Sequence, residues 1–138
     1  MRRLLLLCAV GALTGCASAE GSGEASFIDM MGGSSASEAT RIAARLQGKP
    51  LGSADNPIRT YMPEGQRAYL ARLRCADGKT PGIFPRGQGG IGAYGSLVDL
   101  FAVDCGAASP GRVEIAMDGY QEEHQETRAP DGFTIAAR

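Results

Sequence analysis

The apolar positions have a clear helical period in residues 36–47. Four apolar residues fall at positions i, i+3, i+4 and i+7, on one face of a helix: Ala39, Ile42, Ala43 and Leu46. Ser35 and Glu38 have the spacing of a capping box, in which each side chain satisfies a backbone donor at the helix start. Gly48 and Pro50 supply the stop signals. The pattern therefore predicts a helix over residues 36–47.

From residue 67 onward the apolar period changes to two, as in a strand. One face of that strand would carry Tyr69, Ala71, Leu73 and Cys75. Residues 76–79 have a turn composition, so we predict a strand over residues 67–75 that leads into a hairpin. The same stretch also contains good helix formers, and Pro63 and Glu64 could begin a helix, so this alternative stays open.

Residues 96–105 form a nearly continuous apolar run, rich in branched and aromatic side chains. Such a run predicts a central strand that is covered on both faces. We expect Leu97, Phe101 and Val103 to be nearly inaccessible on one face. Val98 and Leu100 should be covered on the other.

A third strand is predicted for Arg112–Asp118, where apolar and polar residues alternate. Val113, Ile115 and Met117 share the face that should point inward. The opposite face, which includes Ala116 and Asp118, should be in water. With the helix at 36–47 packed on a small antiparallel sheet of these strands, the expected fold is a single α+β domain over residues 35–138.

The first residues of the chain have the pattern of a secretion signal. Two arginines follow Met1, and residues 4–13 form an apolar run that is too short to span a bilayer. The next residues complete Leu13-Thr14-Gly15-Cys16, which resembles the lipobox of bacterial lipoproteins. That resemblance implies a signal peptide over residues 1–15 and acylation of Cys16 as the first mature residue. An ordinary signal peptide cut near Ala17-Ser18-Ala19 is the alternative.

Residues 16–34 are expected to connect the lipid to the domain. Residues 17–26 are small and polar and read as a flexible tether. The apolar residues 27–31 could dock on the domain or rest on the bilayer, and the sequence does not choose. Ala17, which follows the lipobox cysteine, is not the aspartate that retains many lipoproteins in the inner membrane. The lipobox resemblance therefore favours the inner leaflet of the outer membrane, facing the periplasm.

Four cysteines occur in the chain. Cys8 would leave with the signal peptide and Cys16 would carry lipid, which leaves Cys75 and Cys105 in the domain. In an oxidising compartment this pair is expected to form a disulfide, with free buried thiols as the main alternative. A metal site would need further ligands at short spacing, and a redox pair would need the C-x-x-C spacing.

Charge gives no reason to expect a nucleic-acid partner. The chain has 14 basic and 15 acidic residues, a net charge of −1. Loss of Arg2 and Arg3 with the signal peptide would leave 12 − 15 = −3. No cofactor motif is evident either.

Several short blocks of the sequence together resemble a group of small bacterial envelope proteins of unknown function. The blocks are residues 56–59, 65–70, 73–78, 94–99, 117–120 and 131–135. The resemblance covers about residues 51–135. It implies β structure for residues 67–75 and supplies no catalytic residues.

Residues 87–92 have the letters of a G-x-G-x-x-G loop, but a strand rather than a helix is predicted after them. We therefore expect a mobile glycine connector there.

His124, the single histidine, lies in sequence near Glu122, Glu123 and Glu126. These groups could hold a divalent metal weakly, but a solvated acidic loop is the simpler interpretation. Ser96, His124 and Asp99 could in principle form a Ser-His-Asp catalytic site. However, no motif such as G-x-S-x-G marks Ser96 as a nucleophile.

Arg72, Arg74 and Arg86 are the best candidates for a binding surface. The two former residues would share a strand face, and Arg86 could lie on the hairpin partner, where the three could grip an anionic group. Cross-strand pairing with Asp99, Asp104 or Glu114 is the alternative.

Two functions remain. The first is a non-enzymatic, membrane-anchored module that binds an envelope protein or glycan. The second is a small envelope hydrolase or metal-assisted enzyme that uses His124 and nearby carboxylates. The single histidine favours the first, for which we expect no catalytic residues, no metal and no cofactor.

Overall fold

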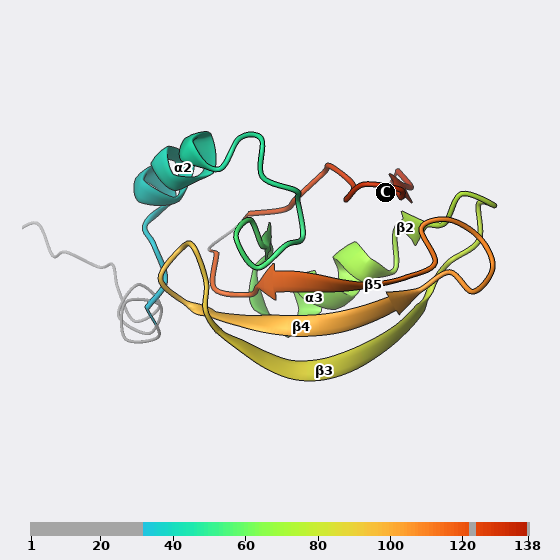
Figure 1. Ribbon diagram of the computed structural model, residues 1–138. Coiled ribbons are helices and arrows are strands. Elements are labelled where there is room, and N and C mark those ends of the chain that lie inside the picture. Colours follow the sequence, from blue (N-terminus) through green and yellow to red (C-terminus); the bar gives the residue numbers. More distant parts are fainter. Residues whose placement is uncertain (1–31, 122–123, 138) are drawn as a thin grey trace, which may run out of the picture.

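The computed structural model describes residues 32–121 and 124–137. The predictions for Cys16 and for residues 27–31 lie outside the described residues. Within the described ranges there are two helices, α2 (Ala36–Arg45) and α3 (Met62–Leu70). The strands are β1 (Ile58–Arg59), β2 (Leu73–Arg74), β3 (Gly82–Ile91), β4 (Leu97–Asp104), β5 (Arg112–Asp118) and β6 (Thr134–Ile135). The predicted α+β class is confirmed (Figure 1).

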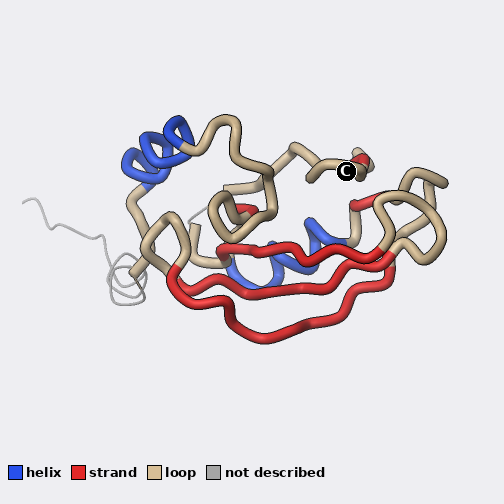
Figure 2. The backbone as a smooth tube through the Cα atoms, in the orientation of Figure 1, coloured by secondary structure: helices blue, strands red, loops and turns tan. Residues whose placement is uncertain are grey.

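Four of the strands form one sheet in the order β1-β5-β4-β3. β4 pairs antiparallel with β3 and β5, so the predicted strand at residues 96–105 has the expected inner position. β1 is parallel to β5, which makes the sheet mixed. β2 and β6 form a separate two-stranded sheet at one end of the longer strands (Figure 2).

The predicted strand over residues 67–75 is wrong in most of its length. Helix α3 ends at Leu70, and only Leu73–Arg74 is a strand, which pairs with β6. Pro63 lies in the first turn of the helix. Backbone N–H groups in this turn have no acceptor within the helix, so a proline costs no hydrogen bond there. The buried residues of α3 are Gln66, Tyr69 and Leu70, at i, i+3 and i+4. Over so short a stretch the helical and strand periods select overlapping apolar residues, and packing decides between them.

The bounds of helix α2 agree closely with the prediction, but its buried residues pack on a loop rather than on the sheet. The Ser35 side chain accepts a hydrogen bond from the backbone N–H of Glu38 at 3.4 Å, as a capping residue does. Its buried residues, Ala39 and Ile42, pack against Tyr94 in the loop between β3 and β4. Helix α2 therefore lies at one end of the sheet, whereas α3 contributes to the main core (Figure 1).

The core lies between α3 and the sheet. Its fully buried members include Ile58, Leu73, Val103 and Met117. Leu97 and Phe101 are half-buried, contrary to prediction, because β4 borders the exposed edge strand β3. On the opposite face Val98 is buried as expected, whereas Leu100 is only half-buried.

The glycine run at residues 87–92 is not a loop connector. It continues strand β3 to Ile91, and the register with β4 shifts twice along it. A Cβ on Gly89 would lie 3.0 Å from a methyl group of Val98, which is tighter than an ordinary contact. Glycine here allows the edge strand to pass close over β4.

Strand β5 is confirmed, but its second face is not wet throughout. Ala116 and Asp118, which were expected in water, are both buried. Asp118 accepts hydrogen bonds from the Ser96 hydroxyl at 2.6 Å and from the Tyr120 N–H at 3.0 Å. A carboxylate on a predicted polar face thus becomes an internal hydrogen-bond acceptor.

Candidate functional site

The structure brings His124, Glu126 and Arg72 to the surface of helix α3. They line a small cavity of about 50 Å³ together with Thr60 and Tyr69. A wider hollow of about 550 Å³ adjoins this cavity and shares four of its lining residues, Gly65, Ala68, His124 and Gln125. Tyr61 and Glu64 complete the wider hollow. We call the two together the α3 groove.

Small residues on α3 keep the groove open. Tyr61, Gly65, Ala68 and Arg72 follow one another at helical spacing along this side of the segment. A Cβ on Gly65 would meet the Thr60 side chain at 3.5 Å, an ordinary van der Waals distance. A Cβ at residue 65 therefore fits without a clash. The small residues Gly65 and Ala68 leave the space beside them open.

Glu126 anchors the segment opposite α3. The carboxylate is buried and accepts hydrogen bonds from Arg128 at both oxygens, from Nε at 3.0 Å and from Nη2 at 2.8 Å. The backbone N–H groups of Thr127 and Arg128 also donate to Oε1, each at 3.0 Å. Burial alone would raise the pKa of Glu126, but the hydrogen bonds from Arg128 outweigh it and hold this pKa well below its ordinary value. Glu126 is therefore ionised at neutral pH.

His124 faces this carboxylate. Its Nε2 lies 3.9 Å from Oε2 of Glu126, which is too far for a hydrogen bond. The Nε2 atom is buried and has no hydrogen-bond partner within residues 32–121 and 124–137. The side chain as a whole is 31% exposed, so the ring lies between the carboxylate and the groove.

The two hydroxyl groups of the cavity donate to backbone carbonyls. Tyr69 Oη donates to the carbonyl of Arg128 at 2.8 Å, and Thr60 Oγ1 donates to that of Asp118 at 3.3 Å. Burial and the nearby charge of Glu126 raise the pKa of Tyr69 far above its ordinary value. The phenol is thus neutral, and neither hydroxyl is positioned by a base as a nucleophile would be.

The predicted arginine patch depended on a hairpin that does not form. Arg72 lies in the turn after α3 and donates from Nε to the carbonyl of Ala136 at 2.9 Å. Arg74 is in β2 and donates to the carbonyls of Ala71 and Leu73. Arg86 is exposed on β3, which pairs with β4 and not with β2.

The carboxylates proposed as partners for these arginines are engaged elsewhere. Asp104 lies 3.8 Å from Arg112, and Asp99 accepts a hydrogen bond from Gln66 at 2.7 Å. Of the three arginines, Arg72 alone lines the α3 groove.

Ser96, His124 and Asp99 do not form a catalytic site. The Ser96 hydroxyl donates to Asp118, and Asp99 is bound to Gln66. Among the described residues, no group of three or more histidine, cysteine or acidic side chains is arranged to hold a metal ion.

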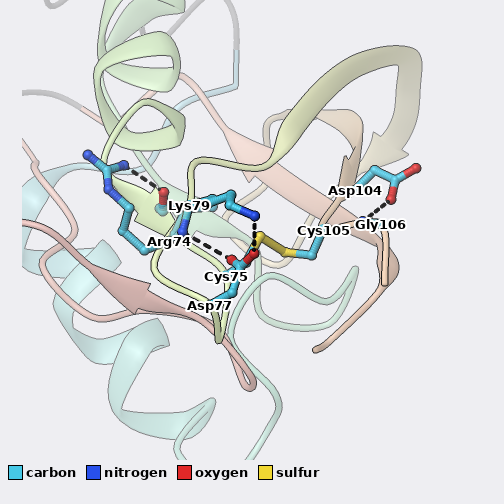
Figure 3. The surroundings of a disulfide bond; sticks show 8 residues. Arg74, Cys75, Asp77, Lys79, Asp104, Cys105 and Gly106 are labelled. Carbon is cyan, nitrogen blue, oxygen red and sulfur yellow. Dashed lines mark hydrogen bonds and ion pairs between the residues drawn. A yellow bond between two sulfur atoms is a disulfide. The ribbon is translucent and has the colours of Figure 1, made fainter. Parts of the chain in front are cut away.

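The predicted disulfide is present. Cys75 and Cys105 are joined, with their Cα atoms 5.7 Å apart. The bond connects the residue after β2 to the residue after β4, at the end of the sheet that is distant from α2 (Figures 1 and 3). It therefore links the segment that follows α3 to the central strand.

Sequence reasoning missed the Glu126 and Arg128 pair and the part played by Tyr69. These residues come from a segment without regular secondary structure and from a helix that was predicted as a strand. The sequence did not show that Glu126 is buried. A glutamate followed two residues later by an arginine is common on protein surfaces and fits neither a helical nor a strand period.

Comparisons of the chain with protein-family models, with curated proteins and with solved structures find no match. The resemblance to small envelope proteins therefore stays a prediction. No helix in the described part of the chain is both long enough and apolar enough to cross a membrane.

Proposed function

We propose that the chain is a lipoprotein of the bacterial cell envelope, anchored by acyl chains on Cys16 and facing the periplasm. The support is the order of a cationic start, a short apolar run and Leu13-Thr14-Gly15-Cys16. Each buried methylene of an acyl chain contributes about 0.8 kcal/mol, so two or three chains give stable attachment. A disulfide between Cys75 and Cys105 fits an oxidising compartment. Ala17 favours the inner leaflet of the outer membrane.

Replacement of Cys16 by serine tests the anchor. The Cys16→Ser protein should lose incorporation of labelled palmitate and should leave the membrane fraction or accumulate as a precursor. Cys8→Ser is the matched control, because that cysteine would be removed with the signal peptide and should have no effect. A wild-type chain that is wholly soluble in the periplasm would overturn the proposal.

The domain itself is proposed to bind an envelope protein or glycan in the α3 groove. The observation that carries this role is that the polar groups beside His124 already have partners. Glu126 is bound by Arg128, and the hydroxyls of Tyr69 and Thr60 donate to carbonyls. Groups held in this way shape a surface, whereas a nucleophile needs a base within hydrogen-bond reach. The guanidinium of Arg72 and the open space over Gly65 and Ala68 supply a polar contact and room for a ligand.

Crosslinking in cells tests the groove. A photoreactive amino acid at Ala68, which is exposed in the groove, should capture a specific partner. The same amino acid at Arg67, exposed on α3 but not among the groove residues, is the matched control. Gly65→Leu should fill the groove and abolish the crosslink from residue 68 without unfolding the domain. Equal products from residues 67 and 68, or a crosslink that survives Gly65→Leu, would contradict the binding role.

The alternative is a small envelope hydrolase that uses His124. The observation in its favour is the 3.9 Å approach of His124 Nε2 to Glu126, which a small ring movement could turn into an orienting hydrogen bond. Loss of a general acid or base lowers rates by about 10²- to 10⁴-fold. His124→Ala should therefore abolish complementation of a deletion strain if the chain is such an enzyme. A binding module should retain most of its complementation, because His124 is one of several residues that line the α3 groove.

A further inference from the structure

The end of the domain that carries α2 has three features that point toward one partner. These are the point where the described chain begins, an exposed isoleucine and a pair of exposed arginines. Figure 1 shows that α2 and the loop between β3 and β4 lie together at this end, opposite β2. We propose that this end docks on the surface of an anionic phospholipid bilayer. The inference rests on the lipid anchor proposed above and goes beyond it, because it assigns an orientation and a contact surface.

The described chain begins at the loop between β3 and β4. Gly32 packs closely on Gly95, and the Ser34 hydroxyl donates to the carbonyl of Tyr94. Fifteen residues, 17–31, separate Gly32 from Cys16, and a fully extended chain of that length reaches at most about 50 Å. Acyl chains on Cys16 must therefore lie within about 50 Å of Gly32.

The same end exposes apolar surface. Among the described residues the exposed large apolar side chains are Ile91, at 69%, and Phe84, at 49%. Ile91 closes β3, and the following loop is tightly hydrogen-bonded, with Gly92 N–H donating to the Ser96 carbonyl at 2.8 Å. A hollow of about 410 Å³ joins Ile91 and Ala93 to Leu46 and Lys49 after α2. An apolar side chain on a rigid loop tip can enter the headgroup region of a bilayer.

Helix α2, at the same end of the domain, carries exposed positive charge. Arg41 and Arg45 are exposed one turn apart on α2, and neither takes part in an ion pair within residues 32–121 and 124–137. Of the nearby acidic residues, Asp55 lies 3.6 Å from Lys49, and Glu38 is in the first turn of α2. Arg41 and Arg45 therefore offer positive charge that no described carboxylate pairs, whereas residues 17–31 add Glu20, Glu24 and Asp29 and the mature chain would be negative overall. Anionic headgroups attract such a surface, and each basic residue near it contributes about fivefold to binding.

The absence of tryptophan from the chain gives a direct test. Ile91→Trp places a single fluorescent reporter at the proposed contact. Phe84→Trp places a matched one on the same strand, where residue 84 pairs with Ala102. Each acylated, mature variant is incorporated into vesicles with and without phosphatidylglycerol. In the anionic vesicles we expect the emission of the residue 91 reporter to shift to shorter wavelength and to be quenched by brominated lipid. The residue 84 reporter should change little.

Charge and anchoring are then separated. Arg41→Gln with Arg45→Gln should reduce the quenching of the residue 91 reporter in anionic vesicles. In the unacylated Cys16→Ser form, each arginine replaced should weaken vesicle binding about fivefold. Ala93→Trp, also exposed at this end, replaces the reporter if Ile91→Trp does not fold.

The possible failures can be told apart. If the acylated chain does not float with vesicles, the anchor itself is wrong. If it floats but the residue 91 reporter is not quenched, the docking surface is wrong and the anchor stands. A wavelength shift without quenching, growing with protein density, would show that a second copy of the chain covers Ile91, and this would also overturn the proposal.

Discussion

Helices α2 and α3 have similar lengths but opposite relations to the rest of the domain. Helix α2 has a defined cap and buries only Ala39 and Ile42, against a single loop tyrosine. Helix α3 has no side-chain cap, and it places Tyr69 and Leu70 in the main core. The comparison shows that a helix with strong local signals can be peripheral, whereas one with weak signals can be part of the main core. The reason is that packing of apolar side chains contributes more free energy to a short helix than its own local interactions do.

The two helices also differ in their proposed roles. Helix α3 forms one wall of the groove and is followed within a few residues by the disulfide. Helix α2 carries the arginines of the proposed membrane-facing end. Damage to α3 should therefore affect the whole domain, and damage to α2 should stay local.

The largest effect should come from the disulfide that holds the segment after α3. Cys75→Ser with Cys105→Ser opens a loop of 30 residues. The chain-entropy model gives a loss of about 3.5 kcal/mol, a large part of the stability of a small domain. Urea unfolding of the double variant measures it, with the reduced wild-type protein as a control. A loss below about 1 kcal/mol would show that α3 does not depend on this bond.

A matched pair of leucine truncations compares the helices directly. Leu70 is 3% exposed in the main core, whereas Leu46 is half-buried at the end of α2. We expect Leu70→Ala to lower the free energy of unfolding by about 3 kcal/mol and Leu46→Ala by less than about 1 kcal/mol. Thermal or urea unfolding of both proteins checks the difference. Equal losses would contradict the peripheral position of α2.

The ion pair between Glu126 and Arg128 should make the free energy of unfolding depend on pH in the acidic range. Because the pKa of Glu126 is lower in the folded state than in the unfolded state, its contribution is present above the unfolded pKa of about 4.3. The contribution is lost as pH falls from there through the folded pKa. Glu126→Gln should therefore be less stable than wild type at pH 7, and the gap should narrow below about pH 4.5. Glu114→Gln, at an exposed strand position, should leave the pH profile unchanged.

The smallest effect is expected at the cap of α2. Ser35→Ala should destabilise that helix by about 1 kcal/mol, because the Glu38 N–H loses its side-chain acceptor. Hydrogen exchange of the α2 amides should accelerate about fivefold, while the midpoint of global unfolding should hardly move. Ser37→Ala, inside the same helix, is the matched control. Faster exchange in α3 would show that the two helices are coupled.

Elements with local or strongly periodic signals were predictable from the sequence. The cap and stripe of α2 lie within a dozen residues, and the apolar run of β4 and the alternation of β5 mark strands without reference to other parts of the chain. The pairing of Cys75 with Cys105 followed from counting the cysteines that remain in the domain. Each of these inferences depends on residue type and spacing alone.

Three features depended on contacts between residues that are distant in sequence. These are the helical conformation of α3, the pairing of the glycine-rich edge strand β3, and the groove beside α3. Tyr69 and Leu70 form a helix because Val103 and Met117 give its inner face a surface to pack on. The arginine patch failed because β3 pairs with β4, which no spacing near Arg72 reveals. Asp118 became a buried acceptor only when Ser96 was brought to it, and the fold buries Glu126 although its partner Arg128 is only two residues away. Sequence by itself determined the elements with their own local signals, and tertiary structure decided the rest, because burial and long-range pairing outweigh weak local preferences.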